Sequence, residues 1–356
     1  MQVLKFGGTS VASAEAMLQT IDIIKKALEE DRTLVVSSAI SGCTDQLIEI
    51  GKLAAARDKN CQDKLKALQE RHHGIIDRLL PEGYRGKTRG AVDALFGELE
   101  SIVQGVYLVG ELSPTSLSAV ESFGELLSTR ILTDQFLSQG IACRWLDARE
   151  LVLTRDGVVD TAETYRRIAE AVQQHVHAEL FLVPGFIARD TEGRPTTLGR
   201  GGSDYTASLF AVGLHARKLE IWTDVPGIMT AHPKVVPSAR PIPFISYRAA
   251  QELSHFGAKV IYPPTIQPVV AEGIPIYVKD TFHPAEPGTL VEKNPPRTHG
   301  GVVGIAHSEG IALISLEGSG MVGVPGFSSR LFDALSREQI NIILITSNGY
   351  CYNVRI

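Results

Sequence analysis

The stretch that most constrains the fold of this chain is its opening, where Val3-Leu4 runs into Lys5-Phe6-Gly7-Gly8-Thr9-Ser10. An apolar run followed by paired glycines, hydroxyl side chains and a helical pattern predicts a strand that ends in a backbone loop before a helix. Such a loop suits an anion, because glycines let the backbone approach closely and the N–H groups and helix dipole favour negative charge. Paired glycines after a strand also form ordinary tight turns, so the phosphate interpretation depends on partners farther along the chain.

The composition is that of a globular protein with room for two or three domains, since 44% of the 356 residues are hydrophobic and 21% are charged. A net charge of -5 argues against a nucleic-acid or acidic membrane surface. The four cysteines lack Cys-x-x-Cys spacing, which predicts reduced thiols and neither a disulfide framework nor a zinc site. Without a leader or a long apolar run, a cytoplasmic protein with no membrane partner is expected.

Strands and helices are expected to alternate along the chain. A helical pattern over 17–28 leads to a buried strand at 34–36, which ends in a second loop rich in small and hydroxyl residues at 37–45. Two such loops at neighbouring strand ends predict a ligand crevice, although a helix cap rich in serine and threonine is the alternative for each. The alternation continues with a strand at 142–146, a helix at 161–177 and a strand at 180–183. It predicts an α/β fold with a mainly parallel sheet sandwiched by helices.

Two features in the helical part concern possible site residues. Residues 46–110 are predicted to be wholly helical, and His72-His73 there lacks a carboxylate or second histidine at i+4 spacing. These histidines are therefore expected to be surface or half-buried residues rather than metal ligands. In the next helix, over 114–140, Glu125 lies among apolar residues, so a half-buried carboxylate is expected that needs a partner. That partner is either Arg130 or a cationic group of a substrate.

The stretch 196–207 is the most informative of the chain. It follows a long polar loop over 184–199, which is a candidate lid. Arg200 can clamp a carboxylate with its planar fork, while the amides of Gly201-Gly202-Ser203 can stabilise phosphoryl oxygens at the start of a helix. A purely structural loop is the alternative interpretation.

Two more strand ends carry candidate residues. The strand 219–222 ends in Thr223-Asp224 before a Pro-Gly turn, a suitable place for a nucleotide base and ribose. Lys259 follows a predicted helix over 246–256 and stands at the entry to an apolar strand, where a lysine without an anionic partner would be costly.

Taken in order, six stretches resemble the signatures of aspartate kinase in the amino-acid-kinase superfamily: 5–10, 37–44, 122–128, 199–207, 222–234 and 257–263. The resemblance implies a catalytic domain over 1–295 that phosphorylates the β-carboxylate of L-aspartate with ATP. The product would be 4-phospho-L-aspartate, the first intermediate of lysine, threonine and methionine biosynthesis. Mg²⁺ would be held by the nucleotide and water, so no protein metal site is expected.

The same resemblance implies a role for each matching residue. The catalytic residues would be Lys5, Asp204 and Lys259. The phosphate and ATP contacts would be Lys5, Gly7, Gly8, Thr223, Asp224, Met229, Lys234 and Lys259. The aspartate pocket would contain Ser41, Thr44, Glu125, Arg200 and Ser203. Within it, Glu125 would meet the substrate ammonium group and Arg200 its α-carboxylate.

Four positions depart from the family pattern. Asp45 replaces the usual asparagine and places a negative charge near an anionic substrate. Met229 stands where a tyrosine is frequent, and His232-Pro233-Lys234 replaces Asp-Pro-Arg, which keeps a cation but loses an acid and a bidentate fork. These changes concern the affinity for ATP and aspartate more than the fold.

After a connector rich in proline and glycine over 284–301, residues 301–356 resemble an ACT domain, a small α+β regulatory module. The expected elements are a strand at 311–315, a loop at 318–326, a helix at 327–337 and a strand at 341–346, with Leu331, Leu335 and Ile340 facing the core. The resemblance implies an effector site for lysine or threonine beside the loop 321–326, and a homodimer or higher homo-oligomer. Because the family usually carries two such modules, the chain is expected to be incomplete, and its length leaves no room for a homoserine dehydrogenase extension.

Other functions remain open at this point. Another amino-acid kinase acting on glutamate or carbamate is possible, although Glu125 with Arg200 favours an α-amino acid substrate. A catalytically weak amino-acid sensor is a second alternative, against which the retention of Lys5 and Lys259 speaks. A Rossmann dehydrogenase would need Gly-x-Gly-x-x-Gly after the first strand, which this chain lacks.

Overall fold

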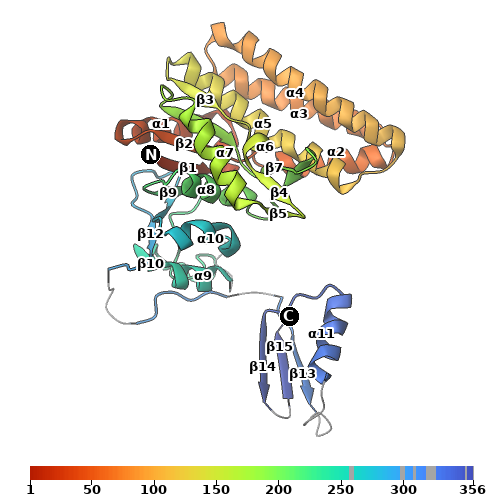
Figure 1. The fold of residues 1–356 in the computed structure, drawn as a ribbon, viewed down its shortest axis with the longest axis vertical. Coiled ribbons are helices and arrows are strands. Elements are labelled where there is room, and N and C mark those ends of the chain that lie inside the picture. The colour runs from red at the N-terminus through yellow and green to blue at the C-terminus, as the bar shows by residue number, and fades with distance from the viewer. Residues whose placement is uncertain (256–259, 297–300, 308–309, 318–325, 349–350, 356) are drawn as a thin grey trace. The chain divides into compact units, whose positions relative to one another are not determined.

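The computed structural model describes residues 1–255, 260–296, 301–307, 310–317, 326–348 and 351–355. The chain divides into two compact units, Met1–Ala306 and His307–Ile356. Figure 1 shows the elements of each unit.

The large unit is built on one sheet of eight strands in the described residues. Its strands, in the order in which they hydrogen-bond, are β10 (Phe244–Ser246), β12 (Thr289–Glu292), β11 (Ile276–Asp280), β9 (Leu219–Thr223), β1 (Gln2–Phe6), β2 (Thr33–Ser37), β6 (Leu180–Pro184) and β3 (Cys143–Trp145). All neighbours are parallel except β11 and β12. The central strands are buried on both faces, as their continuous apolar sequences require. The prediction of a mainly parallel sheet between helices is confirmed.

Helices cover this sheet and begin where the glycine-rich loops end. The short turn η1 (Thr9–Val11) and helix α1 (Ala14–Glu30) follow β1, and the Ser13 side chain caps α1 by accepting from the Ala16 amide. Farther along the chain, α8 (Gly202–Gly213) packs on β1, β2 and β9, and α9 (Tyr247–His255) packs on β10 and β12. Helices α7 (Thr161–Gln173) and α10 (Pro263–Glu272) pack against α8. The helix predicted over 161–177 thus ends earlier, at Gln173.

Four helices stand together beside the sheet, where α3, α4 and α5 run alongside one another (Figure 1). They are α2 (Cys43–Ala55), α3 (Asn60–Leu79), α4 (Glu82–Val109) and α5 (Pro114–Ser138). The prediction that 46–110 is helical is confirmed apart from two short breaks. The expected exposure of the histidine pair is wrong for His72, which is fully buried against Phe96, whereas His73 is partly exposed and pairs with Asp93.

The predicted lid over 184–199 is instead part of a second sheet. Its strands, in order, are β5 (Val158–Val159), β4 (Leu153–Arg155), β7 (Ile187–Asp190) and β8 (Pro195–Thr197), and α6 (Ala148–Leu151) precedes them. Strands β7 and β8 form an antiparallel hairpin whose turn holds Gly193 at a φ of 83°. The polar residues that suggested a loop lie in this hairpin: Asp190 is the last residue of β7 and pairs across the turn with Arg194.

The stretch after α9 also differs from its prediction. Its residues 256–259, including Lys259, lie outside the described residues. The next residues, 260–262, form no strand, and α10 begins at Pro263. Paired prolines suit the first turn of a helix, where the missing N–H groups have no intrahelical partner.

The described residues of the small unit form a three-stranded antiparallel sheet and one helix. Its elements are β13 (Leu313–Glu317), α11 (Phe327–Arg337), β14 (Leu344–Asn348) and β15 (Cys351–Arg355), with β15 in the centre of the sheet. Of the predicted core residues, Leu335 is buried and Leu331 half-buried, but Ile340 is exposed because it follows the end of α11. Of the predicted effector loop at 321–326, residues 321–325 lie outside the described residues, and Gly326 is the N-cap of α11. None of the described helices is long and apolar enough to span a membrane.

Candidate active site

Backbone hydrogen bonds join the loop after β1 to the loop after β2 and to the end of β9, at the carboxyl ends of the central strands. The Gly7 amide donates to the Trp222 carbonyl over 3.1 Å, which ties the first loop to β9. The Ser41 amide donates to the Gly8 carbonyl over 3.2 Å, which ties it to the second loop. A side chain at Gly8 would place its Cβ 3.0 Å from the Ala39 carbonyl oxygen, so this close approach needs a glycine. The two glycine-rich and serine-rich loops thus face one crevice, as predicted from the strand ends.

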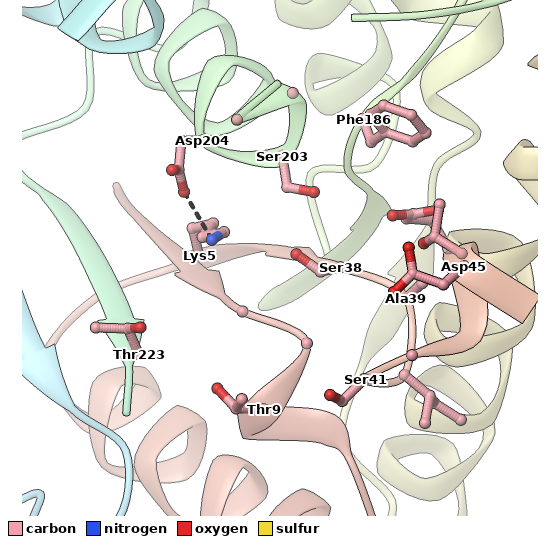
Figure 2. A pocket seen from close by; sticks show the side chains of 18 of the residues that line it. Lys5, Thr9, Ser38, Ala39, Ser41, Asp45, Phe186, Ser203, Asp204 and Thr223 are labelled. Atoms are coloured by element: carbon pink, nitrogen blue, oxygen red, sulfur yellow. Dashed lines mark ion pairs between the residues drawn. The ribbon is translucent and has the colours of Figure 1, made fainter. Parts of the chain in front are cut away.

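Lys5 and Asp204 meet at the floor of this crevice, although 199 positions separate them in the printed sequence. Lys5 Nζ lies 2.7 Å from Asp204 Oδ1, and the two side chains are only 12% and 13% exposed. Figure 2 shows the pair between the end of β1 and the first turn of α8. Since a lysine alone in such a site would be costly to desolvate, Asp204 holds its charge in place.

Backbone amides at the floor are free to bind an anion. Helix α8 begins after Gly201, which has a left-handed φ of 70°, and the amides of Ser203 and Asp204 have no hydrogen-bond partner in the described part of the chain. The same holds for the Gly8 amide. Together with Lys5 these amides form a positive cradle at a helix N-terminus, the usual arrangement for phosphoryl oxygens.

A buried carboxyl group lies on one side of the cradle. Glu125 of α5 is only 3% exposed, and the Ala39 backbone amide donates to its carboxyl group. Its Oε2 atom has no partner among the described residues. Burial raises the pKa of Glu125 to about 8. The predicted alternative that Arg130 pairs with Glu125 is wrong, because Arg130 pairs with Asp134 one helical turn farther along.

These groups line a pocket of about 540 Å³. Most of the predicted site residues line it: Lys5, Gly7, Gly8, Ser41, Thr44, Glu125, Ser203, Asp204, Thr223 and Asp224. Figure 2 shows Thr223 on one side and Ala39, Asp45 and Phe186 on the other, with Lys5 and Asp204 between them. We call the first the β9 side, formed by Thr223 and Asp224. The second, which we call the α5 side, is formed by Ala39, Thr44, Asp45, Glu125 and Phe186.

Some predicted residues do not line this pocket. Arg200 is exposed, and its guanidinium carbon lies 5.3 Å from the centre of the Tyr262 ring. Met229 is bridged to Pro241 in a loop after β9, and Lys234 is exposed in the same loop. Lys259 lies outside the described residues.

The sequence interpretation missed several lining residues: Thr9, Ser38, Ala39, Ile40 and Phe186. Four of these are neighbours of predicted residues in the two loops, so the serine-rich pattern already pointed to them. No pattern in the sequence pointed to Phe186, because an aromatic residue after a buried strand is normally predicted to belong to the hydrophobic core.

Among the described residues, no three or more His, Cys, Asp or Glu side chains lie together so that they could hold a metal ion. Oxygen ligands for a hard cation are nevertheless present, since the carboxylates of Asp204 and Asp224 both line the pocket. Such a donor set fits Mg²⁺ that is shared with phosphate oxygens and water, because Mg²⁺ keeps several waters and takes few protein ligands.

The sequence of this chain matches those of a known protein family. The model of the amino acid kinase family matches residues 1–280, and an ACT domain model matches residues 314–354. Lysine-sensitive aspartokinase 3 of Escherichia coli is 34% identical over 353 residues, which cover 97% of this chain and 76% of that protein. A bifunctional aspartokinase/homoserine dehydrogenase of Haemophilus influenzae is 33% identical over 361 residues, which cover 99% of this chain. The chain spans only 44% of the length of that bifunctional relative.

Solved structures agree with these matches. Aspartokinase III of Escherichia coli, solved in complex with lysine and aspartate, superposes with a TM-score of 0.82 at 33% identity. Aspartate kinase of Clostridium acetobutylicum superposes with a TM-score of 0.83 at 25% identity. Each covers the whole of this chain, which in turn covers 78% of each of them.

Proposed function

The chain belongs to the aspartokinases of the amino acid kinase family, and from this premise we propose that it transfers the terminal phosphoryl group of ATP to the β-carboxylate of L-aspartate. The product is 4-phospho-L-aspartate, the first intermediate of lysine, threonine and methionine biosynthesis. One observation carries the proposal: a buried carboxyl group with a free oxygen, that of Glu125, lies on one side of a phosphate-type cradle. That arrangement suits an acceptor with an ammonium group next to a phosphoryl donor.

The floor of the pocket would hold the group that is transferred. Phosphoryl transfer depends on positioning and on positive charge, and it needs no covalent nucleophile. Lys5 and the free amides of Gly8 and Ser203 supply that charge, while Asp204 keeps the lysine in place. Mg²⁺ bound with the nucleotide would neutralise part of the phosphate charge, with Asp204 and Asp224 as its protein ligands.

The α5 side would bind the amino acid acceptor. Glu125 would pair with its ammonium group, and the hydroxyl groups of Ser41 and Thr44 would contact the rest of the molecule. We assign its α-carboxylate to Arg200, whose guanidinium group would have to leave the Tyr262 ring and turn towards the pocket. A planar bidentate fork is the preferred partner for a carboxylate.

The β9 side would bind the nucleoside part of ATP. Thr223 and Asp224 lie at the open end of β9, next to the loop that carries Met229 and Lys234. A parallel sheet offers ligands the crevice at the carboxyl ends of its strands, which is where these residues lie. Lys259 completes the proposed set of ATP contacts.

The reaction is tested by incubating the protein with ATP, Mg²⁺ and L-aspartate and trapping the acyl phosphate with hydroxylamine. Parallel reactions contain L-glutamate or no acceptor. Hydroxamate that depends on aspartate is the expected result. Absence of product while aspartate binds in calorimetry would contradict the proposed reaction and favour an amino-acid sensor.

We further propose that residues 1–295 form the catalytic domain and residues 301–356 a regulatory ACT-like domain that binds lysine or threonine. The support is the ACT domain match over 314–354 and the lysine bound by the similar Escherichia coli enzyme. Regulation of this kind goes with a homodimer or higher homo-oligomer. Titration of lysine and threonine into the hydroxamate assay tests the effector, and sedimentation velocity with and without each amino acid tests the assembly.

A further inference from the structure

Phe186 stands out among the residues that line the pocket because of its backbone. Its φ is 67°, in the left-handed region, which bulky residues other than glycine rarely adopt. The other described non-glycine residues with positive φ are Arg57, Asp156, His215 and Gln339, and none of these lines the pocket. A strained residue that persists at a pocket wall indicates that the surrounding structure holds it there for a functional reason.

The backbone of Phe186 is held on every side. The Ile187 amide donates to the Gly185 carbonyl over 2.7 Å, which closes a three-residue turn of the rare, strained sense around Phe186. The Phe186 amide donates to Thr206 Oγ1 of α8 over 3.0 Å. Its carbonyl accepts from the Leu198 amide over 2.8 Å. These three hydrogen bonds fix where the side chain leaves the main chain.

Two glycines leave room for the ring and the turn beside α8. A Cβ atom at Gly202 would lie 2.7 Å from Phe186 Cδ2, and one at Gly185 would lie 2.7 Å from the Ser203 Cβ. The ring is half-buried, packs against the core, and lines the pocket. In Figure 2 it lies on the α5 side, beside Ser203 and above Asp45.

We infer that Phe186 sets the length of the amino acid that this pocket accepts, an inference that rests on the proposed function. The ammonium group of the acceptor would be held at Glu125, which belongs to a buried helix, and its reacting carboxylate must reach the floor at Lys5. The distance between these anchors is fixed by the core, so an additional methylene group must bulge sideways. In this proposal the ring, which lines the pocket, fills that space. Its fixed backbone sets where the ring begins, and its close packing on Gly202 limits how far it can turn aside. An acidic amino acid with one side-chain methylene fits, and one with two is rejected.

The inference is tested by comparing kcat/KM for aspartate with kcat/KM for glutamate in a Phe186→Gly variant. Glycine removes the ring and adopts positive φ without strain, so the fold is expected to remain. One methylene group in a fitted pocket accounts for roughly 10- to 200-fold discrimination, so the ratio should fall at least about tenfold, mainly through faster reaction of glutamate. A Phe186→Leu variant should give an intermediate ratio.

The matched control is His215→Gly, which removes a side chain from an exposed position with a φ of 47°, away from the pocket. Its selectivity should equal that of the wild type. An unchanged ratio in a folded Phe186→Gly variant would overturn the inference. If that variant does not fold, the wild-type ratio in the folded Phe186→Leu variant would overturn it.

Calorimetric binding of both amino acids without nucleotide separates this inference from the proposed reaction. If the wild type makes no product from aspartate, the proposed reaction is contradicted. The ratio of the dissociation constants for aspartate and glutamate then still tests whether the Phe186 ring selects the shorter amino acid. If the ratio of the dissociation constants for aspartate and glutamate is the same in the wild type and in Phe186→Gly, the role of Phe186 is contradicted. The proposed reaction is not affected by that result.

Discussion

The two sides of the pocket are built differently, and the difference indicates how each residue acts. On the α5 side, Glu125 is almost fully buried and Ala39 is 5% exposed, so a charge there has few water molecules to solvate it. On the β9 side, Thr223 is half-buried and Asp224 is exposed at the end of a strand. Electrostatic effects are strong where water is excluded and weak where water and salt screen them. The size of a substitution's effect on stability or on kinetics should therefore increase with the burial of the residue. The formal charge of the residue should matter less.

The largest expected effect concerns Glu125. In the wild type without ligands, the pKa of Glu125 is about 8, whereas its ordinary value is 4.5. Below pH 4.5 the folded and unfolded chains both hold the proton, and as pH rises the unfolded chain loses it first. Stability should therefore fall between these two values, and a Glu125→Gln variant should escape this loss. Near pH 8 its free energy of unfolding should exceed that of the wild type by about 4 kcal/mol.

Urea unfolding at pH 5 and pH 8 measures this difference, with the fluorescence of Trp145 and Trp222 as the signal from the large unit. Glu121→Gln is the comparison, since burial also raises the pKa of the half-buried Glu121. Its effect should be smaller. A stability difference between Glu125→Gln and wild type that does not change with pH would show that Glu125 is ionised in the free protein.

The second effect concerns the floor between the two sides. Lys5→Ala should lower kcat at least about a hundredfold, equivalent to about 2.7 kcal/mol, because Lys5 would contact the group that is transferred. Aspartate binding, measured by calorimetry, should stay nearly unchanged, because the proposed contacts of Lys5 are to the transferred phosphoryl group, whereas Glu125 and Arg200 would hold the amino acid. A wild-type rate in this variant would refute the assigned role.

A smaller effect is expected at the Gly8 position. A methyl group there would press on the Ala39 carbonyl at 3.0 Å, which displaces the loop that joins the floor to the α5 side. Small misplacements of reacting groups are costly, so Gly8→Ala should lower kcat about tenfold. Gly7→Ala is the comparison, because its Cβ would make only ordinary contacts at 3.7 Å. Equal losses in both variants would mean that the close approach to Ala39 is unimportant.

The smallest effect tests whether an exposed charge on the α5 side is as weak as its exposure implies. Asp45 lines the pocket at its exposed rim and would repel an anionic acceptor. Asp45→Asn should lower KM for aspartate about threefold at low salt, and the gain should shrink at high salt. Glu49→Gln, an exposed acid on the same helix that pairs with Lys64, should leave KM unchanged. A tenfold or larger change for Asp45→Asn would contradict the link between burial and effect.

Much of the fold of the large unit could be predicted because its strands and helices have clear local sequence patterns. The strand, glycine loop and helix at 1–30 and the buried strand at 33–37 appear as predicted, because apolar runs and helical spacing are read along the chain. The segment 184–199 was misjudged because its polar residues belong to a hairpin, and its strands are short and half exposed. Such strands give only a weak apolar alternation.

The site was predictable only where it lies in the glycine-rich loops. Lys5, Gly8 and Ser203 were found from loop patterns that reflect backbone geometry, which is local. Phe186 was missed because its place in the pocket depends on a positive φ and on hydrogen bonds to α8 and to the end of β8. The position of Arg200 over Tyr262 likewise depends on residues more than sixty positions apart, which no local pattern reveals.

The ion pair between Lys5 and Asp204 means that this lysine is held in position before any ligand arrives. A free lysine side chain explores many rotamers, and fixing it costs roughly 2 kcal/mol of conformational entropy. Here that ordering takes place during folding, at the expense of protein stability rather than of ligand affinity. A phosphate group that enters the pocket therefore meets an ammonium group already aimed at it. More of the binding energy then remains for holding the two reactants in line.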